Sequence, residues 1–303
     1  MAHSHEHEME NVTGTRMFIT MMLNFVITAA EIIGGLLSGS LALLSDAIHN
    51  FSDGISIVIS YAAIRLRARP NSERHTFGFK RAEVFAAVIN SSALIVITVF
   101  LFIEAIKRFI NPVPIHGQMM FIVAAIGLVA NVIGTLLLRR GAKSSMNIKA
   151  TYLHLLTDAI SSVGVILGGL AIYLWNVYWL DPVITLLIGL YIFKEAYEIV
   201  RETVHVLMEG TPHDMSLPQM KETLERIPGV RDVHHVHVWS VGEHDNHMEA
   251  HIRVDDMMVS AGDAIRAQAE EILHDQFEIG HVTLQVEHAS CPDVGLIKQQ
   301  SHA

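Results

Sequence analysis

The sequence has few charged residues and a single cysteine. Only 17% of its residues are Asp, Glu, Lys or Arg, whereas about a quarter is usual for a soluble domain. The lone Cys291 excludes an internal disulfide and is typical of a domain in a reducing compartment. A net charge of −10 disfavours nucleic acid as a partner. With 51% hydrophobic residues, the composition favours a membrane protein.

The first fifteen residues lack the basic stretch followed by an apolar stretch that is typical of a signal peptide. We therefore expect no cleaved signal. This segment carries His3, His5 and His7. Two interpretations stay open together: the three histidines collect metal ions, or they belong to a plain tail.

Long apolar runs are abundant from Met17 to Val204. A helix needs about 20 apolar residues to cross the hydrocarbon core of a bilayer, which is about 30 Å thick. Six runs have this length and predict six transmembrane helices. The runs are Met17–Leu37, Ser40–Ile64, Ala82–Phe109, Gln118–Leu138, Ala150–Leu174 and Pro182–Val204.

Basic residues concentrate in two of the loops between these runs, and the positive-inside rule makes those loops cytoplasmic. With an even number of spans, both termini are then cytoplasmic too. We expect a multi-pass protein of the bilayer, in a bacterial inner (plasma) membrane. The basic residues of the two loops are Arg65, Arg67, Arg69, Arg74, Lys80 and Arg81, and then Arg139, Arg140, Lys143 and Lys149.

One pattern occurs twice inside the apolar runs. His49 is followed four residues later by Asp53, and His154 is followed four residues later by Asp158. This spacing places both side chains of a pair on one helix face. Ionisable residues within spans are rare and point to function. If the second and fifth runs pack in opposite directions, we expect His49 near Asp158 and Asp53 near His154.

Two imidazoles and two carboxylates form a ligand set typical of tetrahedral zinc. Imidazole ligands also admit cobalt or cadmium, whereas calcium and magnesium prefer more oxygen ligands. Zinc needs neutral imidazole and ionised carboxylate, so metal and protons compete for the site, which favours proton-coupled antiport. Four protein ligands leave no open position for a hydrolytic water, so an enzyme is disfavoured. A metal sensor anchored by its spans would not need ligands in the bilayer.

Further polar residues lie in the same runs, and each has two interpretations. Asp46 precedes His49 by three residues and is either a fifth ligand, an entry group or proton relay, or simply a residue near the end of its span. Asn24, Glu31 and Asn131 either line an aqueous path or bond between helices, and the second is slightly favoured.

The chain after Thr211 changes to short elements in the order α-β-β-α-β. The Ser216–Gln219 segment predicts the start of a helix, Val230–Val241 and His247–Val254 predict strands, and a helix and a strand follow at 260–277 and His281–Glu287. This order resembles a small ferredoxin-like or metallochaperone-like α+β domain, and the positive-inside rule places it in the cytoplasm. Its three-stranded sheet is too small to bury both faces, which favours a homodimer.

This domain is rich in histidine, which favours metal binding. The expected regulatory zinc ligands are His234, His251, His281 and Glu287; the alternative is that these histidines are simply exposed to solvent. His235 and His237 point to the other strand face from His234 and are alternative ligands. The chain is thus divided into a His-bearing tail (1–15), a transport domain (16–206), this domain (207–290) and a second tail (291–303).

Several motifs, in order, resemble those of the cation diffusion facilitators, in particular their zinc-transporting branch. Ser38–Asp53 (SGSLALLSDAIHNFSD) is similar to the family's second-span signature, and Leu153–Asp158 (LHLLTD) to its fifth-span signature. His75–Gly78 (HTFG) resembles the next cytoplasmic loop, and Val233–Trp239 (VHHVHVW) the first cytoplasmic strand. The resemblance covers nearly the whole chain. It implies a homodimer that exports zinc by proton-coupled alternating access, and His at position 49 is similar to the zinc-selective branch.

The sequence also departs from that family. Some members carry a second metal site in the loop after the second span, but here only His75 matches, since Ser72 and Phe79 occupy the other ligand positions. The loop site is therefore expected to be weak or absent. Gly262 and Gln285 stand where some members place histidine ligands, so the ligand set of the cytoplasmic site is expected to differ.

Overall fold

The computed structural model describes residues 22–139, 146–242, 245–288 and 295–297. They form two compact units: residues 22–61 with Ile89–Val200, and Ala62–Val88 with the chain from Arg201 onward. The second unit therefore includes the ends of three long helices as well as the C-terminal domain. The domain limits expected from the sequence at residues 15, 206 and 290 stay predictions.

The first half of the chain is helical. A helix at Met22–Ser38 is followed by the long helices of the chain, with Gly39 at positive φ in the turn before the next one. These helices are α2 (Leu41–Arg67), α3 (Ala82–Ile110), α4 (Gly117–Leu138), α5 (Met146–Trp175) and α6 (Leu180–Leu207).

Three helical segments in the described part of the chain are long and apolar enough to cross a membrane: Ala82–Ile110, Gly117–Leu138 and Tyr152–Trp175. The protein is therefore an integral membrane protein with a helical transmembrane domain. The helix Met22–Ser38 is apolar but shorter within the described residues. α2 has 27 residues, about 40 Å at 1.5 Å per residue, but Asp46, His49 and Asp53 lower its apolar character. Six spans thus stay a prediction.

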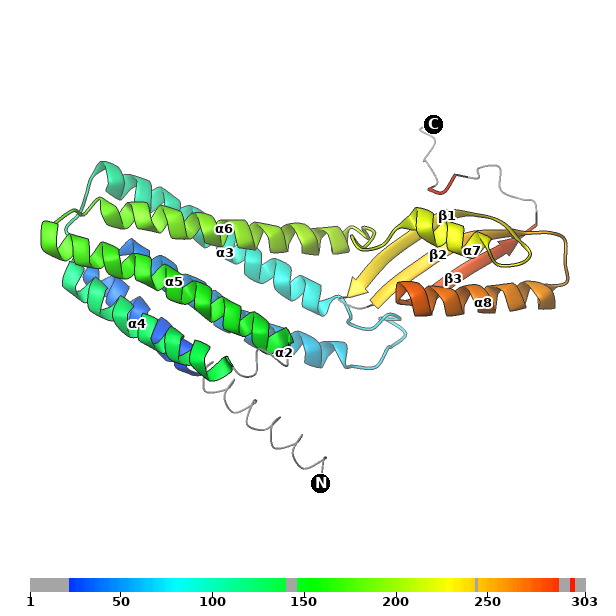
Figure 1. Cartoon of the computed structure of the whole chain (residues 1–303), viewed down its shortest axis with the longest axis horizontal. Helices are drawn as coiled ribbons and strands as arrows, with labels where there is room; N and C mark the ends of the chain where they lie inside the picture. Colours follow the sequence, from blue (N-terminus) through cyan, green and yellow to red (C-terminus); the bar gives the residue numbers. More distant parts are fainter. Residues whose placement is uncertain (1–21, 140–145, 243–244, 289–294, 298–303) are drawn as a thin grey trace, which may run out of the picture. The chain divides into compact units, whose positions relative to one another are not determined.

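Small residues allow the helices of the first unit to approach closely. α4 and α5 lie side by side (Figure 1), and a Cβ on Gly169 would stand 2.8 Å from the backbone nitrogen of Phe121. A Cβ on Gly34 would stand 2.7 Å from Val123. These distances are too short for a methyl group, so the glycines are packing positions.

A carboxylate at the start of α6 holds the start of α2. Asp181 is completely buried; its side chain accepts hydrogen bonds from the Ser40 hydroxyl at 2.5 Å and from the backbone N–H groups of Leu41 (2.9 Å) and Ala42 (3.2 Å). Backbone N–H groups at the start of a helix have no partner within the helix. Asp181 therefore acts as an N-cap supplied by a different helix.

The C-terminal domain is a three-stranded sheet, β1 (Val230–Gly242), β2 (Asp245–Val254) and β3 (Ile279–Glu287), with helices α7 (Leu217–Glu225) and α8 (Val259–Phe277). The strand order is β1-β2-β3. β1 pairs with β2 antiparallel, and β2 with β3 parallel. The parallel pair needs a crossover, which α8 provides (Figure 1). The predicted α-β-β-α-β order is confirmed.

One face of this sheet packs against α7 and α8. Its core contains Val233 and Ile252 from the strands, and Leu224 and Leu273 from the helices. Because strand side chains alternate between faces, the opposite face carries the polar residues of β2 and β3. Ser216 caps α7 by accepting from the Gln219 N–H, as predicted. α8 begins at Val259, one residue before the helix predicted at 260–277, and has no side-chain cap.

Charged pairs join the loop after α2 to the sheet within the second unit. Asp245 accepts from Lys80 Nζ at 2.8 Å and from Arg67 Nη2 at 2.8 Å. Partial burial opposes ionisation of this carboxyl, but Lys80 and Arg67 hold its pKa below the usual value. These pairs explain why the basic residues of the loop belong to the same compact unit as the sheet.

Candidate functional site

Four side chains from α2 and α5 come together in the first unit, and we call them the helix group: His49, Asp53, His154 and Asp158. His49 Nε2 lies 3.7 Å from Asp53 Oδ2 and 3.8 Å from Asp158 Oδ1. His154 Nε2 lies 3.2 Å from Asp53 Oδ2 and 3.5 Å from Asp158 Oδ2. Each imidazole thus faces one carboxylate of its own helix and one of the other helix. These are the contacts that the repeated i, i+4 spacing led us to expect.

The ligand atoms of the helix group face one another without satisfying one another. His49 and Asp158 are buried, and both nitrogens of His49, Oδ2 of Asp53 and Oδ2 of Asp158 have no hydrogen-bond partner among the described residues. Buried polar atoms normally have partners. One ligand atom each from His49, Asp53 and His154 lies within 4.8 Å of the others. A cation held between the facing atoms would satisfy Nε2 of His49 and the two carboxylate oxygens.

A hollow of about 330 Å³ adjoins the helix group and is lined by His49, Asp158, Asp46, Ser161 and Tyr191 among others. The Asp46 carboxylate, which is buried, accepts hydrogen bonds from the hydroxyls of Ser161 (2.7 Å) and Ser162 (3.5 Å). Asp46 is therefore held by α5 hydroxyls one turn from the ligands. This position fits an entry group or relay better than a fifth ligand.

A second cluster lies on β1, β2 and β3, and we call it the sheet group: His234, His235, His251 and Glu287. His234 is completely buried; its Nδ1 lies 2.9 Å from Asp232 Oδ2 and its Nε2 lies 3.0 Å from Glu287 Oε1. His251 Nδ1 lies 3.3 Å from Glu287 Oε2. One nitrogen from each of the three histidines lies within 4.8 Å of the other two.

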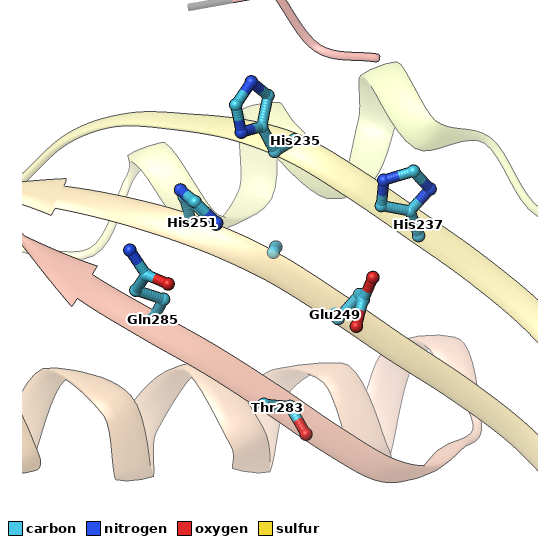
Figure 2. A pocket seen from close by; sticks show the side chains of 7 residues that line it. His235, His237, Glu249, His251, Thr283 and Gln285 are labelled. Carbon is cyan, nitrogen blue, oxygen red and sulfur yellow. The ribbon is translucent and has the colours of Figure 1, made fainter. Parts of the chain in front are cut away.

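Figure 2 shows His235 and His251 projecting from neighbouring strands beside His237, Glu249 and Gln285. These side chains line a pocket of about 330 Å³. The nitrogens of His234 and Nδ1 of His251 lie close to the carboxylates of Asp232 and Glu287, but neither they nor Glu287 Oε1 make a hydrogen bond of good geometry among the described residues. An imidazole-carboxylate set with free lone pairs fits zinc. The residues present therefore fit a second metal ion.

The sheet group differs from the expected ligand set at one position, where His235 stands in place of His281. His281 of β3 pairs with His247 of β2, and their ring centroids are 4.7 Å apart. His247 precedes His251 by four residues on β2. His281 therefore lies apart from the sheet group. His235 takes its place, because the β1–β2 register shifts between His234 and His237 and His235 has a positive φ of 49°. This irregularity brings two consecutive histidines toward one site, which regular alternation forbids.

A salt bridge supports the sheet group from α7. Lys221 Nζ lies 2.6 Å from Asp232 Oδ1 and also donates to the Val233 carbonyl. Burial opposes ionisation of Asp232, but Lys221 holds the pKa of this carboxyl below its usual value. An ionised Asp232 beside Nδ1 fixes the orientation of the His234 ring. No motif in the sequence indicates this support.

His75 lies in the loop between α2 and α3, in a turn where its backbone pairs with Ser72. Its ring stacks on Phe79 with centroids 4.4 Å apart. These neighbours occupy the positions where the resemblance required ligands, and an aromatic ring supplies none. The structure thus gives His75 no ligand partner in the described part of the loop. His3, His5, His7 and Cys291 lie outside the described residues.

Two protein-family models match this chain, one over the helical half and one over the C-terminal domain. Residues 17–208 match the family described as "Cation efflux transmembrane domain", and residues 212–289 match "Cation efflux protein, cytoplasmic domain".

Three curated relatives cover most of the chain. Zinc transporter ZitB of Escherichia coli (strain K12) is 38% identical over 98% of this chain and 96% of its own length. The metal cation efflux system protein CzcD of Cupriavidus metallidurans is 34% identical over 95% and 90%. The cadmium, cobalt and zinc/H(+)-K(+) antiporter of Bacillus subtilis is 35% identical over 95% and 92%. The chain therefore belongs to the cation efflux family, the cation diffusion facilitators, and its relatives are consistent with the zinc branch of that family.

Proposed function

We propose that this protein exports Zn²⁺ from the cytoplasm in exchange for protons, with Cd²⁺ or Co²⁺ as further substrates. The helix group binds the ion, and alternating access exposes it to each side in turn. The names of the relatives, zinc transporter and cadmium, cobalt and zinc antiporter, support this substrate class.

One observation carries the proposal: two imidazoles and two carboxylates from two helices converge with separations of 3.2–3.8 Å between facing nitrogen and oxygen atoms. Metal–ligand bonds to nitrogen and oxygen are about 2.0–2.2 Å long. Two ligands at that distance from one ion, at a tetrahedral angle, are about 3.4 Å apart. The observed separations match this spacing, so an ion needs only small side-chain movements to bind.

Proton exchange follows from the ligand chemistry. Zinc requires neutral imidazoles and ionised carboxylates, and protons convert both to forms that do not bind. A proton arriving from the acidic side of the membrane therefore displaces the ion. The hollow beside His49 and Asp158 gives water and ions a route to these atoms.

The sheet group is part of the same proposal as a regulatory zinc site that senses cytoplasmic metal. The protein acts as a homodimer in a bacterial inner membrane with both termini in the cytoplasm. Support comes from the match to the cytoplasmic domain of cation efflux proteins, the polar sheet face that α7 and α8 leave open, and the basic loops.

The test is zinc flux into proteoliposomes, with and without a pH gradient, for the parent and for Asp158→Ala. We expect gradient-driven flux in the parent and its loss, by at least about 100-fold, in the variant, because removing a metal ligand costs more than removing its supporting contacts. Glu104→Ala removes a carboxylate at the exposed end of α3 and is the matched control. Flux that survives in Asp158→Ala would show that the helix group is structural.

A further inference from the structure

A further acid of the first unit, Glu31, is buried and is not one of the four residues of the helix group. Glu31 lies on the helix Met22–Ser38 and has no solvent exposure. Its Oε2 accepts a hydrogen bond from Asn50 Nδ2 at 3.1 Å, whereas Oε1 has no hydrogen-bond partner among the described residues. The proposed function gives this side chain no role.

The α4 side of Glu31 is formed by backbone. A Cβ on Gly127 would stand 2.6 Å from Glu31 Oε1, so glycine is what makes room for the carboxyl group. The helices run antiparallel here, because Gly34 lies against Val123 while Ile27 and Glu31 lie against Gly127. Continuing this register by one turn brings Asn24 toward Asn131.

These asparagines extend the polar region along the two helices. Both side-chain polar atoms of Asn131 and Oδ1 of Asn24 are buried without a hydrogen-bond partner among the described residues. Buried unsatisfied polar groups are the usual binding sites for internal water. We call Asn24, Glu31, Asn50 and Asn131 the polar strip. It leads from the residue next to His49 toward the start of the first helix.

Among the residues that the structure describes, the groups that act on Glu31 include no cation. The titratable groups that act on it are Asp46, from the start of α2, and Asp158, from α5, and both are acids. The contacts from the remaining side are the neutral Asn50 and Gly127. A buried carboxylate without a cation is very costly, and such a group takes up a proton instead. Glu31 is therefore a proton-holding group in the metal-free protein.

We propose that Glu31 is a second proton carrier of the transport cycle, separate from the metal ligands. When a divalent cation binds beside Asn50, its charge favours the carboxylate, and the carboxyl O–H proton passes to water in the polar strip. When the metal leaves, the carboxylate takes a proton from water and becomes neutral again. This inference rests on the proposed function, and it assigns one exchanged proton per chain to Glu31.

The test counts protons released per zinc bound, with the purified full chain in detergent. Glu31→Gln is the isosteric variant: its amide oxygen can still accept from Asn50, but it cannot ionise. We expect it to bind zinc within about tenfold of the parent and to release about one proton fewer per chain. Its flux should depend less steeply on the pH gradient. Glu104→Gln, the same change at the exposed end of α3, should match the parent in all three measurements.

An unchanged proton count in a zinc-binding Glu31→Gln protein would overturn the inference, as would complete loss of zinc binding in a folded variant. If Glu31→Gln does not fold, Glu31→Asp keeps an ionisable group at the position. This acid should restore the parental count, whereas a reduced count with zinc binding intact would contradict the proposal. Failure of the proposed function is seen separately, as flux that survives in Asp158→Ala.

Discussion

The helix group and the sheet group use the same ligand types but are held differently. In the helix group the ligands come from two helices, and His49 Nε2 lies as far as 3.7 and 3.8 Å from the nearest oxygens of Asp53 and Asp158. In the sheet group His234 is held between Asp232 and Glu287, and Lys221 holds Asp232. Supporting contacts orient ligands and raise metal affinity. The helix group therefore suits an ion that must leave, and the sheet group suits an ion that stays.

Removal of one ligand of the helix group should give the greatest loss of zinc flux and leave zinc binding by the sheet group intact. Asp53→Ala removes the carboxylate that faces His154 and should lower zinc flux by at least about 100-fold. The sheet group should still bind zinc in this variant, because none of its ligands has changed. Flux in proteoliposomes and zinc content per chain measure the two effects. A variant that loses all zinc binding would contradict the independence of the groups.

The reverse experiment removes a ligand of the sheet group. His251→Ala leaves Glu287 without its imidazole neighbour and should weaken the zinc retained by the C-terminal domain by about 100-fold. Flux should fall by less than about tenfold if the site is regulatory. The control is His274→Ala, an exposed histidine of α8. A collapse of flux equal to that of Asp53→Ala would show that the sheet group is part of the ion path.

A smaller loss, of zinc affinity, is expected when the salt bridge that supports the sheet group is broken. Asp232→Asn removes the charge between Lys221 and His234 and should lower zinc affinity at the sheet group by about tenfold. Zinc titration calorimetry measures this change. Asp255→Asn removes a comparable charge from an exposed pair with Arg231 and should leave affinity unchanged. Equal affinities in both variants would mean that Asp232 does not orient His234.

A still smaller effect is expected on the stability of the second unit, which should depend on pH. Burial, followed by the neighbouring His281 and Lys80, lowers the pKa of His247. The unfolded chain then binds the proton more readily, so stability is lost as pH falls below about 6.5. Hydrogen exchange of β2 at pH 7.5 and 5.5 should show this loss. His247→Phe, beside Phe77 and Trp239, should reduce it; an undiminished pH effect would assign it to another group.

Sequence reasoning could predict the helix group because helical spacing is regular. A His and an Asp four residues apart share a face whatever the rest of the fold does, so the pairing of α2 with α5 was the only further assumption. The α-β-β-α-β domain was also predictable from its alternating pattern and from Ser216.

The sheet group was less predictable, because strand faces depend on register. A shift between His234 and His237 changes which histidines share a face, and nothing in VHHVHVW fixes where that shift falls. The pairing of His281 with His247 likewise depends on how β3 aligns with β2. Asp232 and Lys221 come from different elements, and their contact appears only in three dimensions.

The cap that Asp181 forms on α2 has a mechanical consequence. It ties the beginnings of α2 and α6 together through Ser40, Leu41 and Ala42. We therefore expect this end of α2 to stay in place when the rest of the helix tilts. His49 lies nine residues beyond Ser40, about 13 Å along the helix. A tilt of about 10° therefore moves it by about 2 Å, as far as a zinc–ligand bond is long. We expect release of the ion to need only this swing, with every helix intact.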